Sequence, residues 1–212
     1  YPMTLIRQTS VADAVKLDFA SGIRAMMRQD PDVILVGEVR DEETAEMAFR
    51  AAMTGHQVYT TLHTNSAVGA IPRLLDIGIV PDIMAGNIIG IIAQRLVRKL
   101  CRTCRQSYDP DVKERRLLGL SPTEPASLFR SVGCEQCDYQ GYRGRGGIIE
   151  ILKVDAAIDE LVARRATARE ILTAARAKGF KTLAEDGIRL VRGGVTSVDE
   201  LMRVADLTDR MA

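Results

Sequence analysis

Four cysteines occur as two C-x-x-C pairs, Cys101 with Cys104 and Cys134 with Cys137, and the chain has no other cysteine. Each C-x-x-C turn brings two sulfurs within reach of one ion, and four thiolates in a tetrahedron make a closed structural zinc site. A redox dithiol would need only one pair, and four thiolate ligands leave no open position for a catalytic water. Free thiols are the alternative. We expect these cysteines to bind Zn²⁺ in a reducing cytoplasm, because none is scattered as in a disulfide framework.

Glu38, His56 and His63 are the other side chains suited to a reaction site. Glu38 directly follows Gly37, which lets a ligand approach closely, and a carboxylate there could hold a Mg²⁺-bound water or polarise an attacking one. A structural ion pair of Glu38 with Arg40 explains the residue equally well. The two histidines of the chain cannot share a metal, because six residues of extended chain separate them by roughly 20 Å. The spacing favours a functional His63 and a structural His56.

The elements that must position these side chains form a predicted βαβ unit. The apolar run Val33–Val36 is typical of a strand buried on both faces of a parallel sheet, and Gln57–Leu62 predicts a second strand because it is rich in β-branched residues. Between them, Asp41 can cap a helix that Gly55 can end. Ligands bind at the carboxyl ends of the strands in open α/β sheets. The periodicity therefore places Glu38 and His63 at the expected ligand edge.

The rest of the chain is predicted to be mostly helical, with a looser section in the middle. That section, residues 105–133, contains three prolines and no long periodic run, so we expect metal rather than a core to hold it. From Ile148 onward, three capping boxes predict a helical bundle. The boxes pair Thr167 with Glu170, Thr182 with Glu185 and Ser197 with Glu200; further strands are predicted over Met3–Gln8 and Gln94–Leu100, and helices over Phe19–Met27, Ser66–Ile77 and Pro81–Ile92.

Composition argues against several classes of protein. Hydrophobic residues make up 46% and charged residues 27% of the 212, as in a soluble globular protein, and the length suits one domain or one domain with a small appendage. The net charge is +1 and aromatic residues are 4%, so we expect no nucleic-acid partner. The most apolar run, Ile83–Ala93, is too short to span a bilayer. No signal peptide is apparent, and the chain begins as one does when it is cut from a longer protein.

Two segments have ordinary explanations that we favour. A basic stretch around the first cysteine pair is best explained as a solvated strand face, with contact to a partner as the alternative. The glycine-rich segment 141–147 lacks the lysine and the serine or threonine of a P-loop, and no phosphate-cradling glycine loop occurs elsewhere in the sequence. It is better explained as a tight connection beside the cysteines. The basic stretch consists of Arg95, Arg98, Lys99, Arg102 and Arg105.

Several long motifs are more specific than composition or spacing, namely Phe19–Arg24, Arg28–Asp41, Thr54–Asn65, Gln94–Cys101, Gly141–Arg145 and Asp186–Glu200. The first three resemble the secretion ATPase superfamily. The later ones, together with the cysteine pairs, resemble more narrowly the assembly ATPases of type II secretion and type IV pili. The resemblance covers nearly the whole chain.

The resemblance implies an α/β fold: part of a RecA-like parallel-sheet ATPase domain, a tetracysteine zinc-binding insertion and a C-terminal helical bundle. The corresponding division is 1–100 for the ATPase core, with its Walker B and histidine box, 101–147 for the zinc element and 148–212 for the helical subdomain. A cytoplasmic homo-hexamer, peripherally associated with the inner membrane, would hydrolyse ATP with Mg²⁺. Its partners would be the platform and adaptor proteins of a pilus or secretion machine. The Walker A loop would lie upstream of Tyr1.

The resemblance also implies roles for individual residues. The stretch ending in Glu38 is similar to an atypical Walker B, with Gly37 where related enzymes carry an aspartate, and Glu38 would activate water or support Mg²⁺. Gly37 and Arg40 are the expected nucleotide-site residues. His63 would contact the γ-phosphate, and the histidine box makes His56 a candidate again. The cysteines are similar to the zinc element of extension-type enzymes, which retraction ATPases usually lack.

Two hypotheses of other classes stay open at this point. The chain could belong to a zinc-stabilised scaffold that docks partners of a secretion machine and hydrolyses nothing, and a degenerate upstream loop would favour that function. A DNA-translocating motor is disfavoured by the neutral charge and the few aromatic residues. The sequence does not distinguish secretion from a motility pilus or a conjugative pilus.

Overall fold

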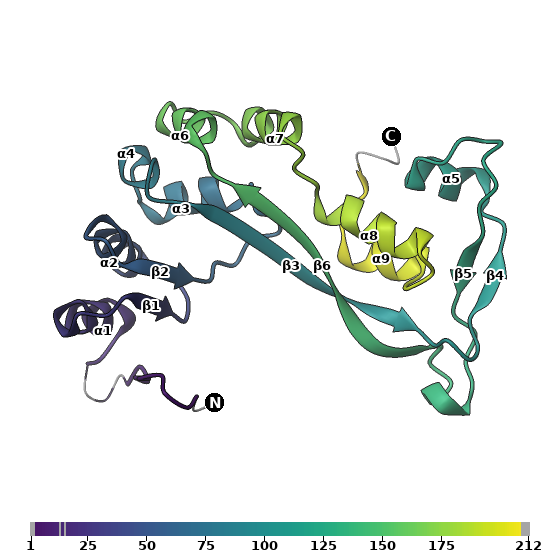
Figure 1. Cartoon of the computed structure of the whole chain (residues 1–212), viewed down its shortest axis with the longest axis horizontal. Coiled ribbons are helices and arrows are strands. Elements are labelled where there is room, and N and C mark those ends of the chain that lie inside the picture. Colours follow the sequence, from purple (N-terminus) through teal and green to yellow (C-terminus); the bar gives the residue numbers. More distant parts are fainter. Residues whose placement is uncertain (1–2, 13, 15, 209–212) are drawn as a thin grey trace. The chain divides into compact units, whose positions relative to one another are not determined.

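The computed structural model describes residues 3–12, 14 and 16–208, and the chain divides into two compact units (Figure 1). The first unit takes the chain up to Ile91 together with Lys153–Ala177, and the second takes Ile92–Leu152 together with the part from Lys178 onward. The units cut across the predicted three-part division, which stays a prediction about function. In the described part of the chain, no helix is long and apolar enough to cross a bilayer.

The first unit is built from helices and a pair of strands, namely α1 (Phe19–Met26), the 3₁₀ helix η2 (Met27–Gln29), β1 (Val33–Val36), α2 (Glu42–Met53), β2 (Gln57–Thr60), α3 (Ala70–Ile77), α4 (Pro81–Met84), α6 (Ala156–Ala163) and α7 (Ala168–Ala177). β1 and β2 pair in parallel, with Val33 opposite Gln57. α2 connects them and is capped by Asp41, whose carboxylate accepts a hydrogen bond from the Thr44 amide. The predicted βαβ unit is therefore confirmed.

Only one face of the β1–β2 pair is covered. Ile34 and Val36 are buried and belong to a core with residues of α1 and α2, whereas Val33 and Leu35 on the other face are 56% and 64% exposed. The prediction that this strand is buried on both faces is therefore wrong for the described chain. An apolar run does not say which neighbours cover its two faces, and among the described residues only one face has them.

The ends of other elements also differ from the prediction. Met3–Gln8 forms no strand. α3 begins later than predicted, because the Ser66 hydroxyl accepts a hydrogen bond from the Gly69 amide in the preceding turn. α4 is a single turn that ends at Met84, because the apolar residues that follow enter β3 (Gly90–Leu100). The predicted helix near the N-terminus is confirmed as α1.

The second unit contains most of β3 together with β4 (Gln106–Tyr108), α5 (Val112–Leu118), β5 (Leu128–Arg130), the 3₁₀ helix η3 (Glu135–Cys137), β6 (Tyr142–Lys153), α8 (Leu183–Arg192) and α9 (Val198–Val204). β3 and β6 form a two-stranded sheet and run side by side, as Figure 1 shows. β4 and β5 pair antiparallel in a second sheet. The predicted strand before the cysteines is confirmed as the C-terminal part of β3.

The section between the cysteine pairs has a core, contrary to the prediction. Leu117, Leu118 and Leu128 are buried in one cluster with residues of α8 and α9. A capping box of Asp111 with Glu114 starts α5, and that helix supplies two of the leucines. The prediction is wrong because a helix of two turns is too short to give a periodic run that the sequence alone reveals.

The predicted C-terminal helices are present and are divided between the two units. The capping boxes of Thr167 with Glu170 and of Thr182 with Glu185 are both present and start α7 and α8. However, α6 and α7 belong to the first unit and α8 and α9 to the second. Residues from Ile148 to Lys153 lie in β6 rather than in a helix.

The third capping box is only half formed, because its glutamate has another role. The Ser197 hydroxyl accepts a hydrogen bond from the Glu200 amide at 3.2 Å, but the carboxylate of Glu200 turns to two arginines. Arg98 and Arg203 each donate to it at 2.7 Å, and Glu200 is 0% exposed. Burial alone would raise the pKa of Glu200, but the guanidinium groups outweigh burial and lower that pKa to about 2.

We expect Glu200→Gln to destabilise the chain by roughly 1.5–3 kcal/mol at pH 7, because it removes the charge that accepts hydrogen bonds from two guanidinium groups, which are themselves 43% and 58% exposed. Ionised Glu200 contributes stability above its unfolded pKa near 4.5, and this contribution is lost as the pH falls toward the folded pKa of about 2. The difference between wild type and variant should therefore shrink between pH 5 and about pH 2. Urea unfolding at several pH values measures it.

Asp199→Asn is the matched control for this test, since Asp199 is an exposed carboxylate next to Glu200 on α9. It should change the free energy of unfolding by less than about 0.5 kcal/mol. Equal and small effects of the two substitutions would contradict the stabilising role of the buried ion pairs.

Candidate functional site

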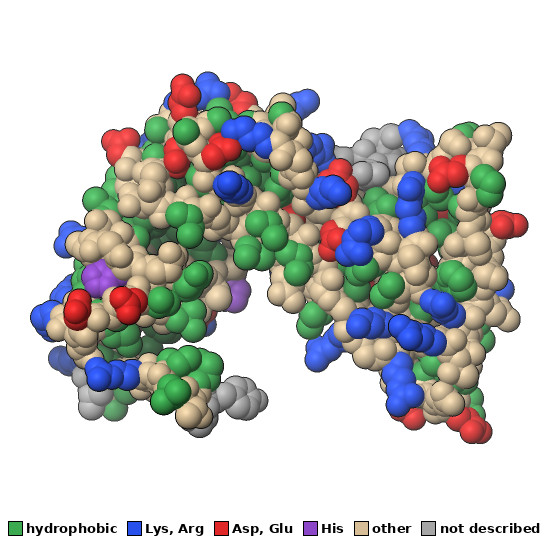
Figure 2. All heavy atoms as spheres, in the orientation of Figure 1, with side chains coloured by type: hydrophobic (Ala, Val, Ile, Leu, Met, Phe, Trp, Pro, Cys, Tyr) green, Lys and Arg blue, Asp and Glu red, His purple; other side chains and the backbone are tan. Residues whose placement is uncertain are grey.

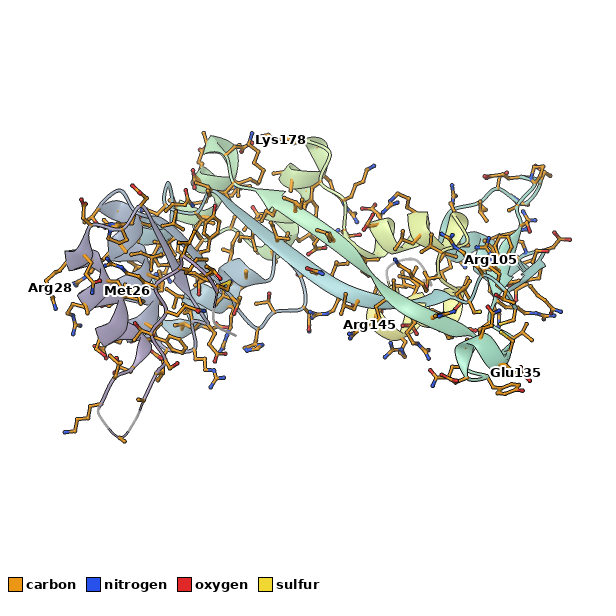
Figure 3. The ribbon with its side chains drawn as sticks, turned by 60° about the horizontal axis from the view of Figure 1, so that its bottom comes forward. Met26, Arg28, Arg105, Glu135, Arg145 and Lys178 are labelled. Atoms are coloured by element: carbon orange, nitrogen blue, oxygen red, sulfur yellow. The ribbon has the colours of Figure 1, made fainter. Side chains whose placement is uncertain are left out.

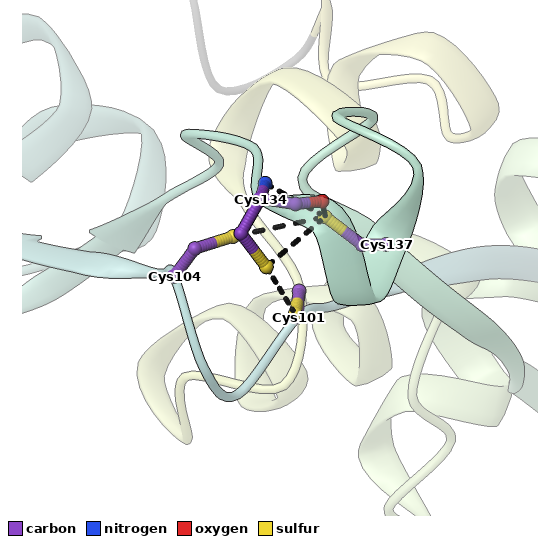
Figure 4. A group of neighbouring side chains, drawn as sticks. All are labelled: Cys101, Cys104, Cys134 and Cys137. Atoms are coloured by element: carbon purple, nitrogen blue, oxygen red, sulfur yellow. Dashed lines mark hydrogen bonds between the residues drawn. The ribbon is translucent and has the colours of Figure 1, made fainter.

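The four cysteines converge in the second unit, where β3 ends and β6 begins (Figure 4). Their Sγ atoms lie within 4.8 Å of one another. The Sγ–Sγ distance is 3.9 Å between Cys101 and Cys134, 3.8 Å between Cys104 and Cys137, and 3.7 Å between Cys134 and Cys137. Four sulfurs at about 2.3 Å from a zinc ion form a tetrahedron with edges of about 3.8 Å. The four residues therefore fit a tetrahedral zinc ion.

Backbone amides surround these sulfurs. The Gly133 amide donates to Cys104 Sγ, and the amides of Cys134 and Gly141 donate to Cys137 Sγ, each at 3.3 Å. Amide donors stabilise a thiolate, which is the form that binds metal. The backbone around these cysteines therefore stabilises the ionised form of the sulfurs.

The thiols differ in how readily they ionise. The amide of Thr103 is the main cause that lowers the pKa of Cys101 to about 7, whereas burial raises the pKa of Cys134 to about 11. Burial also opposes ionisation of Cys137, but its two amide donors hold that pKa below the ordinary value. Cys134 would need the positive charge of a metal to be a thiolate at neutral pH.

Two glycines let the chain turn tightly around the cysteines. At Gly133, with φ +122°, a Cβ would lie 2.7 Å from the Tyr139 carbonyl oxygen; at Gly141, with φ +74°, it would lie 2.6 Å from Ser131 Cβ. Neither position has room for a side chain. The predicted tight connection beside the cysteines is therefore present at the start of the 141–147 segment.

A second group of side chains meets in the first unit, at the carboxyl end of the β1–β2 pair. Glu38 Oε2 lies 3.2 Å from His63 Nε2, and the other oxygen of Glu38 pairs with the Arg40 guanidinium. The Glu38 side chain is 21% exposed, while His63 is 81% exposed. The parallel register explains the meeting, because both residues follow their strands at the same edge.

This environment keeps Glu38 ionised. The hydrogen bond from Arg40, followed by that with His63, lowers the pKa of Glu38 below its ordinary value. An ionised carboxylate can hold a cation-bound water or orient an attacking one, although a low pKa makes it a weaker proton acceptor. The ion pair with Arg40 and the contact with His63 coexist, so the two explanations of Glu38 do not exclude each other.

Gly37 contacts two neighbouring segments of the described chain. Its carbonyl accepts a hydrogen bond from the Thr61 hydroxyl at 2.8 Å, and a Cβ on it would lie 3.3 Å from the ring of Phe19. Packing against α1 is therefore one reason for a glycine here. Its contact with a nucleotide stays a prediction.

His56 lies at the other end of β2 and does not join Glu38. Its Nδ1 atom is 3.0 Å from the Ala51 carbonyl oxygen and 3.1 Å from the Thr54 hydroxyl. These contacts close the C-terminal end of α2. They agree with the structural role that the spacing favours, and a catalytic role for His56 stays a prediction.

The basic stretch is only partly a solvated face. Arg98 bonds to Glu200 and lies 4.1 Å from the centroid of the Tyr142 ring. Arg105 lies 4.3 Å from the centroid of the Phe129 ring and donates to the Gly194 carbonyl. No local pattern indicates the pairing of Arg98 with Glu200, since 102 positions separate them and a capping role is an adequate explanation of the glutamate.

Comparison with known proteins gives matches over almost the whole chain. Residues 1–203 match the family described as Type II/IV secretion system protein. The chain is 47% identical over 199 residues to the Type II secretion system ATPase E of Vibrio cholerae, covering 94% of this chain and 39% of that protein. It is 45% identical to the type IV pilus assembly ATPase PilB of Thermus thermophilus, covering 95% of this chain and 23% of that protein.

A solved structure shares the fold. The crystal structure of the pilus retraction motor PilT with bound ADP superposes with a TM-score of 0.62 and 28% identity, covering 89% of this chain and 43% of that one. The mixed α/β fold with a tetracysteine cluster and C-terminal helices is thus confirmed. The chain spans about two fifths of the length of its type II secretion relatives.

Proposed function

Since the chain belongs to the Type II/IV secretion system protein family, we propose that it is the C-terminal part of an ATP-hydrolysing motor that powers pilus assembly or type II protein secretion. The whole motor would work as a homo-hexamer at the cytoplasmic side of the inner membrane, in contact with platform and adaptor proteins. The names of the relatives support this proposal, because they are ATPases of secretion and pilus assembly.

The observation that carries the proposal is the contact of Glu38 with His63 at the carboxyl edge of β1 and β2. Mg²⁺, when bound with ATP, would neutralise charge on the phosphates. Glu38 would orient the attacking water or a water bound to the ion, and His63, which is mostly exposed, would donate to the γ-phosphate. Arg40 would keep Glu38 ionised and lie with Gly37 beside the nucleotide.

The tetracysteine cluster would have a structural role in this motor. Four thiolates fill the coordination of Zn²⁺, so Cys101, Cys104, Cys134 and Cys137 would hold the ion without leaving a position for substrate. The ion would join the end of β3 to the start of β6. Because retraction ATPases usually lack such an element, its presence favours a motor that extends a pilus or drives secretion.

We expect this chain by itself to bind ATP weakly and to hydrolyse none, because its sequence contains no phosphate-cradling loop. The test compares ATP turnover by residues 1–212 with turnover by the longer enzyme that restores the upstream sequence. Turnover by the longer enzyme alone would support the motor function. If the isolated chain hydrolyses ATP and Glu38→Gln abolishes this activity, the phosphate site is not where we place it. A longer enzyme that hydrolyses no ATP would favour the scaffold function.

A further inference from the structure

A small hollow lies beside the cysteine cluster, separate from the Glu38 edge. Its volume is about 230 Å³, which is below the size of the pockets that hold whole nucleotides or drug-sized ligands, about 300–1,000 Å³. Three segments of the second unit form it: the end of β3, the first cysteine turn and the start of β6. Its lining residues are Lys99, Leu100, Cys101, Arg102, Thr103, Gln136 and Arg143.

The hollow gathers positive charge that no carboxylate balances. Lys99, Arg102 and Arg143 are exposed and line the hollow, and none of them is a member of an ion pair found in the described chain. Figure 2 shows blue side chains gathered over the ends of β3 and β6. Three like charges around one hollow repel one another unless an anion lies between them.

The surrounding residues help to fix the donors of the hollow. The stem of Lys99 crosses Gly146 so closely that a Cβ there would lie 3.0 Å from Lys99 Cε. The Thr103 hydroxyl donates to the side-chain oxygen of Gln136 at 2.8 Å. The amide nitrogen of Gln136 is therefore left as a donor, alongside the three cations.

The cysteines offer a competing explanation, because Cys101 lines the hollow and a zinc ion with four thiolates carries a net charge of −2. However, the sulfurs of Cys104 and Cys137 already receive backbone amides, and the amide of Thr103 acts on Cys101. Main-chain amides therefore supply hydrogen bonds to three of the four sulfurs. Direct measurement can separate the two explanations.

We propose that this hollow binds a phosphate group of a small anionic ligand. A phosphate monoester carries a charge of about −1.5 to −2 at pH 7, which balances three cations better than the single charge of a carboxylate. Two guanidinium forks and an ammonium suit its oxygens. The proposal does not depend on ATP hydrolysis, since none of these residues belongs to the Glu38 site.

Calorimetric titration of the zinc-loaded chain with inorganic phosphate, at constant ionic strength, tests the proposal. We expect saturable binding with one site per chain, and at least tenfold weaker binding in a double variant with Lys99→Gln and Arg143→Gln. Arg145→Gln is the matched control, since Arg145 is an exposed cation further along β6 (Figure 3) and outside the lining of the hollow. It should change the affinity less than twofold.

Further arms separate the alternatives. Acetate at equal charge concentration should not compete, and competition would mean that the hollow does not select phosphate. Unaltered zinc content of the double variant would support the proposal, whereas lost zinc with no phosphate binding in the wild type would assign the cations to the metal. Binding to phosphatidylglycerol vesicles without binding to free phosphate would contradict the proposal that the ligand is a small soluble molecule. Equal losses of phosphate affinity in the double variant and in Arg145→Gln would show that the hollow is not the binding site.

Discussion

In the full-length enzyme, Glu38→Gln is expected to reduce ATP turnover about a hundredfold or more while leaving nucleotide affinity nearly intact. Glutamine keeps the size of the side chain and one oxygen for Arg40, but it removes the charge that, in the proposed mechanism, orients the attacking water or supports Mg²⁺. A hundredfold loss corresponds to about 2.7 kcal/mol of transition-state stabilisation. Steady-state hydrolysis and binding of a non-hydrolysable nucleotide measure the two quantities separately.

One control variant and two histidine variants make this test more specific. Glu43→Gln changes an exposed carboxylate of α2 in the same βαβ unit, and turnover should change less than twofold. His63→Ala should lower turnover, since His63 contacts Glu38, and His56→Ala should have a smaller effect through the end of α2. Normal hydrolysis by Glu38→Gln would remove Glu38 from catalysis. A larger loss at His56 than at His63 would reverse their roles.

The meeting of Glu38 with His63 could be predicted from sequence because it depends on local pattern and one geometric rule. An apolar strand, a capped helix and a β-branched strand follow one another within about thirty residues, and parallel strands end at one edge. The register of Val33 with Gln57 then brings the two side chains together without any distant contact. The cysteine cluster was predictable for a similar reason, since each C-x-x-C turn positions two sulfurs by itself.

Other features depend on contacts that no local pattern encodes. The burial of Glu200 requires Arg98, which lies 102 positions away, so a capping box was the more natural explanation of that glutamate. The exposed face of Leu35 reflects which helices lie nearby rather than the apolarity of its strand. The core around Leu117 needs α8 and α9 to exist at all. Tertiary neighbours decided each of these cases.

Removal of zinc is the second change for which we expect a large effect. Purified chain should contain close to one zinc ion, and thiolate ligation of structural zinc contributes on the order of 10 kcal/mol to folding in small zinc domains. The leucine core of the 105–133 section should limit the damage to the cysteine turns and to whatever they hold in place. Elemental analysis gives the zinc content, and hydrogen exchange before and after chelation locates the loss.

The turn between α8 and α9 should report the loss of metal as clearly as the cysteine turns do. The Leu100 amide donates to the Val195 carbonyl at 2.9 Å, directly before Cys101, and Arg105, directly after Cys104, donates to the Gly194 carbonyl. Chelation should therefore speed exchange at residues 193–197 by tenfold or more and leave α6 and α7, which belong to the first unit, unchanged.

Cys104→Ser provides the matched control, because a chain that binds no zinc should already exchange quickly at this turn and should not respond further to a chelator. Metal-free wild-type protein with four reactive thiols and unaltered exchange would contradict the metal site altogether. Fast exchange confined to the cysteine turns would keep the metal site but disprove its connection to α8 and α9. The two results differ because Leu100 and Arg105 lie outside the ligand turns, so their hydrogen bonds to Val195 and Gly194 would have to carry the effect to the turn between α8 and α9.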